Sequence, residues 1–200
     1  MNKTEIIAKL IIKKNISSIL DVGCRDNSLK NYLPNNIYYS GNDLFQNKNN
    51  GVKYVGDILN INIPTNTYDS VVALDVLEHT DNPYAVFDKL VTIASKFILI
   101  NLPNTYDLKT RWQILVGRRT DKYRFHTHYV LDRHRWMMHY EDIVLFYESK
   151  AKEFDMKLDI IDIQYGGGTH SLSSYLAMLL RYVLPKTLST ASVIGLFEKK

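Results

Sequence analysis

The sequence has 200 residues, a length that corresponds to one domain large enough to bury a sizeable hydrophobic core. Apolar residues make up 46% of the chain and charged residues 23%, a composition that excludes a disordered or fibrous protein. A single cysteine excludes an internal disulfide, and no apolar run approaches the roughly 20 residues that a membrane-spanning helix needs. These features predict a soluble, cytoplasmic protein with a single domain covering residues 1–200.

The net charge of +4 is distributed unevenly along the chain. Between residues 109 and 135, eight basic residues stand against two acidic ones, so this stretch carries a local excess larger than the net charge of the whole chain. The basic residues are Lys109, Arg111, Arg118, Arg119, Lys122, Arg124, Arg133 and Arg135. A positive region of this kind favours an anionic ligand or partner.

The first half of the chain alternates between strand and helix patterns. Residues 3–14 are predicted to form an amphipathic helix that covers an edge of a sheet. Strands are predicted at 18–23, 37–43, 52–55, 68–75 and 97–102. A short helix is predicted at 28–33, and another between the fourth and fifth strands, capped by Thr80 or Asp81. This alternation predicts an α/β fold with a doubly wound, mostly parallel sheet of seven strands.

The second half of the chain is less regular. An insertion at about 105–138 is predicted to bind the substrate, and a helix is predicted at 141–154, with Ile143, Val144, Tyr147 and Ala151 facing inward. Strands at 157–165 and 192–198 are expected to form an antiparallel pair that completes the sheet. Between them an apolar helix is predicted at about 171–184, either buried or forming an apolar contact surface for a lipid-like substrate or a membrane.

The turn after the first strand has the pattern of a cofactor site. An apolar run ends at Asp21 and Val22, turns at Gly23, and continues into a helical segment. Backbone N–H groups and the helix dipole point outward at such a turn. The second strand ends at Asp43, whose carboxylate suits the two hydroxyls of a ribose. A dinucleotide is disfavoured, because close approach of a pyrophosphate needs glycines that this turn lacks after Gly23.

At these residues the chain resembles the class I S-adenosylmethionine-dependent methyltransferases. Their first motif is a strand ending in an acid followed by G-x-G-x-G, which stands here as Asp21-Val22-Gly23-Cys24-Arg25-Asp26-Asn27. The run Leu74-Asp75-Val76-Leu77-Glu78-His79 looks like the branch of ubiquinone-biosynthesis-type and other small-molecule methyltransferases. The resemblance covers about residues 16–104 and implies the methyltransferase fold.

The resemblance also implies a cofactor, S-adenosylmethionine, and a set of residues that bind it. Asp43 would bind the ribose, Asp57 the adenine amino group, and the backbone of Gly23 and Cys24 the methionine part. The complete expected set is Asp21, Gly23, Cys24, Arg25, Asp43, Leu44, Asp57, Ile58, Asp75 and Leu77. Arg25 and Asn27 depart from the glycine pattern, and an alternative interpretation is therefore a non-catalytic cofactor-binding module.

His79 is the candidate catalytic residue. Methyl transfer from a sulfonium depends mainly on holding the acceptor in line with the methyl group. A hydroxyl acceptor must also lose its proton, and His79 follows the fourth strand closely enough to serve as the base. The alternative is that His79 has only a structural role at the start of a helix. The nearby run Asp81-Asn82-Pro83-Tyr84 is likewise interpreted as structural.

The insertion supplies the candidate substrate-binding residues. Together with the exit of the fifth strand they are Asn104, Arg111, His126, His128, Arg133, His134 and Trp136. Arginines pair with carboxylates or phosphates and aromatic rings stack on sugars or bases, so a small-molecule, glycan or lipid-linked acceptor, anionic in character, is expected. RNA is the alternative, because basic residues interleaved with aromatic ones favour nucleic acid. No metal is predicted, since the histidines lack the regular spacing of a zinc site.

Overall fold

The computed structural model describes residues 3–120, 127–128, 130–164 and 184–200. Its elements in chain order are α1 (Lys3–Lys13), β1 (Ser18–Val22), η1 (Ser28–Tyr32), β2 (Tyr38–Asp43), β3 (Tyr54–Val55), β4 (Tyr68–Leu74), η2 (Leu77–His79), α2 (Pro83–Ile93), β5 (Ala94–Pro103), α3 (Leu108–Leu115), α4 (Tyr140–Glu153), β6 (Met156–Gln164), α6 (Lys186–Ser189) and β7 (Thr190–Lys199). The predicted apolar helix at 171–184 lies almost entirely outside the described residues.

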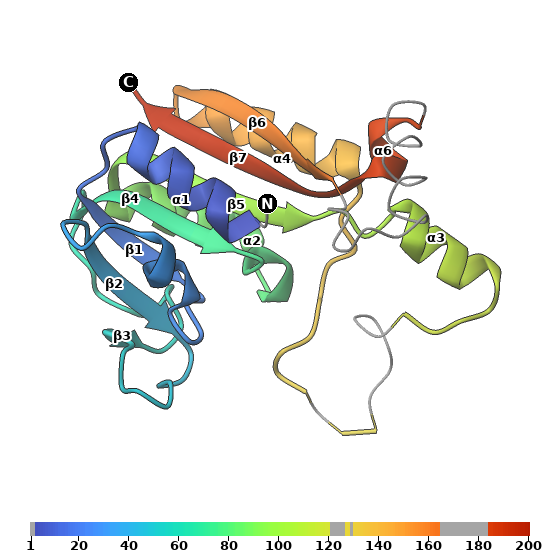
Figure 1. Cartoon of the computed structure of the whole chain (residues 1–200), viewed down its shortest axis with the longest axis horizontal. Coiled ribbons are helices and arrows are strands. Elements are labelled where there is room, and N and C mark those ends of the chain that lie inside the picture. The colour runs from blue at the N-terminus through green and yellow to red at the C-terminus, as the bar shows by residue number, and fades with distance from the viewer. Residues whose placement is uncertain (1–2, 121–126, 129, 165–183) are drawn as a thin grey trace.

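The strands form one sheet of seven in the order β3-β2-β1-β4-β5-β7-β6 (Figure 1). The first five strands of the chain pair in parallel, whereas β7 runs antiparallel to both β5 and β6. This confirms the predicted doubly wound sheet and its antiparallel terminal pair. The strand order reverses between β1 and β4, and in open sheets of this class ligands bind beyond the carboxyl ends of the strands at that point.

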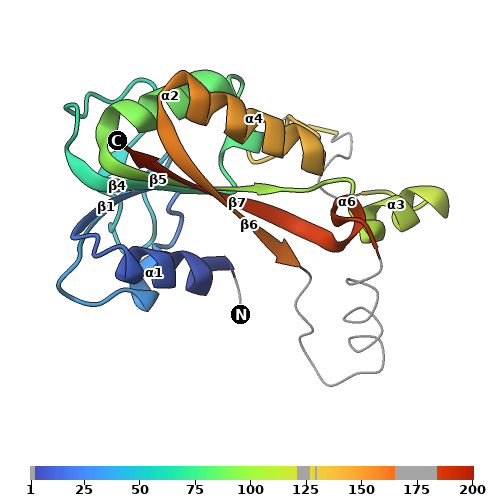
Figure 2. The same ribbon diagram turned by 90° about the horizontal axis from the view of Figure 1, so that it is seen from above.

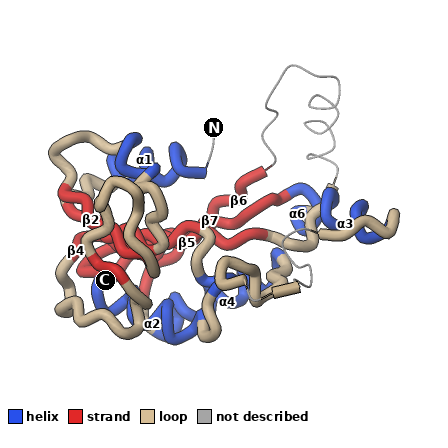
Figure 3. The backbone as a smooth tube through the Cα atoms, turned by 90° about the horizontal axis from the view of Figure 1, so that it is seen from below, coloured by secondary structure: helices blue, strands red, loops and turns tan. Residues whose placement is uncertain are grey.

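Helices cover both faces of the sheet. Helix α1 lies on one face, and α2 and α4 lie on the other (Figure 2); Figure 3 shows the same layers from the opposite side. Helix α1 was expected at a sheet edge, but it covers a face instead. Its buried residues Ile7 and Ile11 belong to a core that includes Ile19 of β1, Leu99 of β5 and Ile194 of β7. A helix that contacts three strands buries more apolar surface than one at an edge.

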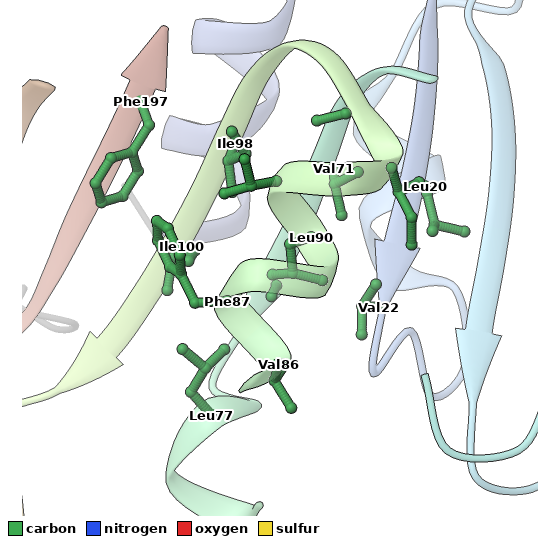
Figure 4. Close-up of a cluster of buried hydrophobic side chains, with 14 of the residues drawn as sticks. Leu20, Val22, Val71, Leu77, Val86, Phe87, Leu90, Ile98, Ile100 and Phe197 are labelled. Atoms are coloured by element: carbon green, nitrogen blue, oxygen red, sulfur yellow. The ribbon is translucent and has the colours of Figure 1, made fainter. Parts of the chain in front are cut away.

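The second core lies between the sheet and helices α2 and α4. Phe87 and Leu90 of α2 pack with strand residues that include Val71 and Ile98 (Figure 4). Each of these four side chains is fully buried, so truncating any of them would leave a cavity that costs about 2–5 kcal/mol. This core fixes α2, and therefore the turn that precedes it, against the carboxyl ends of the strands.

Two local predictions about these helices need correction. Asn82, and not Thr80 or Asp81, caps α2, because its side-chain oxygen accepts a hydrogen bond of 3.0 Å from the amide of Ala85. In α4 the predicted inward residue Val144 is only partly buried. Lys150 is buried instead, where its ammonium lies 2.7 Å from Asp88, which offsets the cost of removing the charge from water.

The insertion after β5 contains helix α3, which the sequence did not predict. None of its residues is buried, and Trp112, Ile114 and Leu115 are exposed. Figure 1 shows α3 beyond the carboxyl end of β5, at the far end of the molecule from β1 and β2. Among the described helices, none combines the length and the apolar character that crossing a bilayer requires.

Candidate functional site

The turn after β1 has the backbone conformation of a glycine-rich loop, although two of the positions concerned are not glycine. Gly23, Arg25 and Asn27 have φ angles of +70°, +48° and +61°, so all three adopt the left-handed conformation. These are the three positions at which the methyltransferase pattern has glycine. An L-residue pays roughly 1–2 kcal/mol for this conformation, and Asn tolerates it better than Arg does. The turn therefore keeps the path of a glycine-rich loop although only one glycine remains.

Gly23 is required by space as well as by backbone angle. A Cβ atom at this position would lie 2.5 Å from Cγ2 of Val76, which follows β4. The amides of Gly23 and Cys24 both donate to the carbonyl oxygen of Asn42 on β2, at 2.8 and 3.1 Å. The turn is thus fixed between the two strands that flank β1, and a side chain at position 23 would push it away from β4.

Asp43 is fixed at the end of β2 by the same turn. One of its carboxylate oxygens accepts a hydrogen bond of 2.8 Å from the amide of Arg25. The Arg25 guanidinium lies 3.3 Å from Asp132 of the insertion, with both side chains about 70% exposed. An exposed pair of this kind contributes little stability. The side chain of Arg25 therefore extends toward the insertion, while its backbone orients the acid that suits a ribose.

Asp21 lies beneath the turn and is withdrawn from water. Its carboxylate accepts a hydrogen bond of 2.6 Å from the hydroxyl of Tyr39. Burial raises the pKa of Asp21 to about 7, only partly opposed by the Tyr39 hydrogen bond. Burial also raises the pKa of the Cys24 thiol to about 12, so this thiol stays neutral and unreactive. Cys24 can serve a ligand only through its backbone.

The remaining residues expected to bind the cofactor differ in exposure. Leu44 and Asp57 are exposed, and the Asp57 carboxylate accepts a hydrogen bond of 3.0 Å from the amide of Leu59 in its own turn. Ile58 and Leu77 are buried in the core on the α2 side of the sheet. The side chains of those two residues are therefore packed in the core, whereas Leu44 and Asp57 present exposed side chains.

Asp75 has the partners that an acid at the end of a central strand needs. It follows β4 with a φ of +56°, and its carboxylate accepts a hydrogen bond from the side-chain amide of Asn101 on β5. Lys3 of α1 forms an ion pair with the same carboxylate. Asp75 and Gly23 thus follow neighbouring parallel strands at one edge of the sheet.

His79 ends the single-turn helix η2, where it is surrounded by other polar side chains. Its Nδ1 lies 3.1 Å from Asp132, and its Nε2 lies 4.0 Å from the carboxylate of Glu78, which is fully buried. The ring of His134 meets the His79 ring edge-on, with 4.6 Å between centroids. His79 is therefore in contact with side chains of two separate segments, its own turn and the insertion.

The insertion is held against this turn by Arg135 and Trp136. Arg135 donates from its backbone amide to the carbonyl of Glu78 and from Nε to the carbonyl of His79, both at 2.8 Å. Its guanidinium also pairs with Asp81. The indole of Trp136 donates to the carbonyl of Thr80 at 2.8 Å. These bonds place His134, the residue before Arg135, beside His79.

The other residues expected to bind substrate do not gather around His79 in this way. Asn104 is buried, and its amide donates to the carbonyls of Thr187 and Thr190 at 2.9 and 2.8 Å, which ties the end of β5 to the start of β7. Arg111 lies on α3, where its Nε donates to the carbonyl of Tyr106. The side chains of His128 and Arg133 are exposed, and His126 lies outside the described residues.

Sequence reasoning missed two residues of this cluster, Glu78 and Asp132. Glu78 directly precedes the predicted catalytic histidine. An acid next to a histidine, just past a buried strand, is a signal that could have identified Glu78. Asp132 is one of only two acids in a strongly basic stretch, but nothing in the sequence shows that it lies beside His79.

Several solved structures that are similar to this chain are methyltransferases. The small RNA methyltransferase HEN1 is 18% identical, with a TM-score of 0.68 over 99% of this chain and 25% of that one. A SAM-dependent methyltransferase from Archaeoglobus fulgidus is 12% identical, with a TM-score of 0.63 over 99% of this chain and 95% of that one. The plantazolicin methyltransferase BamL, solved with SAH, is 16% identical, with a TM-score of 0.60 over 98% of this chain and 82% of that one.

At these identities the similarity shows the fold: the chain has the Rossmann-like architecture of S-adenosylmethionine-dependent methyltransferases. No curated protein matches the sequence significantly. A protein family does match it over residues 2–159, and its description is "Methionine biosynthesis protein MetW". The match spans β1 to β5, the whole insertion and α4, and therefore includes both turns described above.

Proposed function

Since the chain belongs to the family of the methionine biosynthesis protein MetW, we propose from that premise that it is an enzyme that uses S-adenosylmethionine to methylate an oxygen or nitrogen of an acceptor. The observation that carries the proposal is the turn after β1, where residues 23, 25 and 27 keep the left-handed backbone of a glycine-rich cofactor loop. Strained backbone at non-glycine residues clusters at ligand-binding sites, which supports a binding role for this turn.

In this proposal the cofactor lies along the carboxyl ends of four strands, β1 to β4. The methionine part lies along the turn at Gly23 and Cys24, close to Asp21. Asp43 accepts the ribose hydroxyls, for which its second carboxylate oxygen serves while the first holds the Arg25 amide. Asp57 and the backbone of Ile58 accompany the adenine, and Asp75 faces the cofactor from β4. Leu44 and Leu77 complete the binding set.

The acceptor in this proposal lies at His79. If the reacting atom is a hydroxyl oxygen, its proton must leave as the methyl group arrives, and an imidazole beside it assists that loss. The basic residues of the insertion, among them Arg111, Arg133 and the histidines at 126, 128 and 134, favour an acceptor with negative charge. Trp136 supplies an aromatic surface for a sugar or ring. A family described by methionine biosynthesis supports a small-molecule acceptor over a macromolecular one.

This function can be tested by measuring whether a labelled methyl group is transferred from S-adenosylmethionine to an acceptor in a cell extract. Wild-type protein, S-adenosylmethionine carrying a labelled methyl group, and fractionated small-molecule extract are incubated together. We expect label in one fraction with wild-type protein and none with the Asp43→Asn variant, because Asn cannot accept both ribose protons in the same way. Asp26→Asn is the matched control, since Asp26 is exposed in the same turn. Equal labelling by all three proteins would contradict the assignment.

RNA is a second candidate acceptor, and two observations favour it. One solved structure with this fold is titled a small RNA methyltransferase. In the insertion, Lys109, Arg111, Arg118, Arg119 and Arg133 are all exposed. Binding of a short RNA whose affinity falls steeply with salt would favour this acceptor, because each phosphate contact releases counterions. An affinity that does not respond to salt would exclude it.

A further inference from the structure

We propose that Glu78, His79 and His134 form a binding site for a divalent transition-metal ion at the turn after β4. Each residue can direct one ligand atom toward the others, and these three atoms all lie within 4.8 Å of one another. The inference deepens the proposed function and rests on it for the role of the ion. The binding of the ion itself depends only on the geometry of these side chains.

The three donors have nearly the spacing of an occupied site. Ligand atoms about 2.1 Å from one ion in tetrahedral geometry are roughly 3.4 Å apart. The distance from Nε2 of His79 to the carboxylate of Glu78 is 4.0 Å. The three donors therefore have to approach one another by on the order of 1 Å to enclose an ion.

Asp132 lies where the outer partner of a metal-binding histidine would lie. Histidines that bind metal direct the other ring nitrogen toward a carboxylate or carbonyl, which fixes the tautomer and the ring orientation. Nδ1 of His79 lies 3.1 Å from Asp132, so Nε2 is the nitrogen that faces Glu78 and His134. Two carboxylates, from two segments, thus lie beside the two different nitrogens of the His79 ring.

The backbone around these residues holds the donors in place. Glu78 is fully buried, and a carboxylate withdrawn from water is strongly stabilised by a cation beside it. Arg135 bonds to the carbonyls of Glu78 and His79, which fixes the position of the preceding residue, His134. Two donors therefore come from one short turn, and the third comes from a segment bonded to that turn.

The donor types select the kind of ion. Two imidazoles and one carboxylate suit zinc, cobalt, iron or manganese, whereas magnesium and calcium prefer sites made of oxygen alone. Three protein ligands leave at least one position open, as in catalytic metal sites. An oxygen atom of the acceptor can occupy that position beside the cofactor edge of the sheet.

In this arrangement His79 acts through the ion. Coordination lowers the pKa of the acceptor hydroxyl, which releases its proton to solvent water. The oxygen lone pair then forms a bond to the methyl carbon, the carbon–sulfur bond breaks, and its electron pair remains on sulfur as a neutral thioether. The step needs no oxidant or reductant. The ion also holds the acceptor in line with the methyl group.

The test is a titration of untagged protein, freed of metal by a chelator, with Co²⁺ followed by its visible absorption. We expect one equivalent to bind and Zn²⁺ to displace it. His134→Gln should weaken Co²⁺ binding by about tenfold or more, because removing a ligand costs at least as much as removing its outer partner. His128→Gln is the matched control, since His128 is an exposed histidine of the same insertion, and it should bind Co²⁺ as wild type does.

Glu78→Gln provides a second variant of nearly unchanged shape, and circular dichroism checks that each variant is folded. Equal Co²⁺ affinity in wild type and His134→Gln, or no stoichiometric binding by wild type, would overturn the metal site. Calorimetry with S-adenosylhomocysteine on the metal-free protein separates the two proposals. If the protein binds S-adenosylhomocysteine but not Co²⁺, the metal site is wrong and the methyltransferase proposal is retained. If it binds Co²⁺ but not S-adenosylhomocysteine, the methyltransferase proposal is wrong and the metal site is retained.

Discussion

The turns after β1 and after β4 lie at the same edge of the sheet and are built in opposite ways. The first is defined by its backbone: three left-handed residues, and amides that bond to Asn42 and Asp43. The second is defined by side chains: Glu78 and His79 meet residues of the insertion that are more than fifty positions away in sequence.

This difference explains which substitutions each turn tolerates. A turn defined by its backbone can replace glycine with Arg25 or Asn27, provided that the left-handed conformation is kept. A turn defined by side chains loses a contact when one of those side chains changes, even if the backbone keeps its conformation. We therefore expect changes in the first turn to act through strain and burial, and changes in the second to act through lost contacts.

The largest expected effect concerns Asp21, the buried acid beneath the first turn. The ordinary pKa of this carboxyl is 3.8 and its folded pKa is about 7, so between these values the folded chain holds a proton that the unfolded chain has released. Stability should then fall as the pH rises through this window, by on the order of 4 kcal/mol in total. Asp21→Asn should remove the dependence, because Asn still accepts the Tyr39 hydrogen bond.

Urea unfolding of wild type and Asp21→Asn at about pH 4 and pH 8 measures this effect. The variant should be the more stable protein at the higher pH and similar to wild type at the lower one. Asp26→Asn, a change of the same charge at an exposed position, should leave the wild-type pH dependence unchanged. A variant no more stable than wild type at pH 8 would show that Asp21 is not forced toward its neutral form.

A smaller effect, about 3 kcal/mol of destabilisation, is expected for Gly23→Ala. The new methyl group adds the left-handed strain of an L-residue to a contact with Val76 that is too close. Thermal or urea unfolding measures the loss. The double variant Gly23→Ala/Val76→Ala removes the contact but keeps the strain, so it should recover part of the stability. Full wild-type stability of the single variant would contradict the close packing of the two turns.

Arg135→Ala tests the second turn and should cost about 1–2 kcal/mol, the range for lost hydrogen bonds at a partly buried site. Its signature is local. Amide hydrogen exchange in residues 131–138 should accelerate, while the affinity for S-adenosylhomocysteine stays at its wild-type value. Arg133→Ala, at an exposed neighbouring arginine, serves as the control. A loss of cofactor affinity in Arg135→Ala would mean that the two turns are not independent.

The smallest effect is expected for the double change Arg25→Gly and Asn27→Gly. Glycine relieves the left-handed strain but gains freedom in the unfolded chain, so stability should change by less than about 1 kcal/mol. Affinity for S-adenosylhomocysteine should change by less than about threefold, because the backbone path is already correct. Calorimetry decides the outcome. A rise of about tenfold or more would favour the non-catalytic interpretation, in which the natural loop is impaired.

The fold could be predicted because its signals are local. Strands β1, β4 and β5 contain short apolar runs separated by turns and helices, and this alternation is sufficient for the doubly wound sheet. Helix α3 was not predicted because none of its residues is buried. Its sequence therefore lacks the apolar periodicity that indicates an amphipathic helix. The cap of α2 was misplaced by one or two residues because Thr80, Asp81 and Asn82 are all good capping residues.

The site could be predicted only where it depends on the ends of strands. Gly23, Asp43 and Asp75 follow directly from strand positions. The conformation of Arg25 could not be foreseen, because arginine rarely adopts positive φ. Glu78 adjoins His79 in the sequence, but the approach of Asp132 and His134 to His79 depends on contacts between distant segments, and no periodic pattern encodes those contacts.

Binding of S-adenosylhomocysteine to the wild-type protein, measured by calorimetry, is the most direct test of the central claim. We predict one molecule bound per chain. Binding should be lost in Asp43→Asn, because the wild-type carboxylate accepts a hydrogen bond from the Arg25 amide in the turn after β1, and it should be retained in Asp26→Asn. No heat of binding by wild-type protein, or equal binding by Asp43→Asn, would contradict the claim that the turn after β1 holds this cofactor.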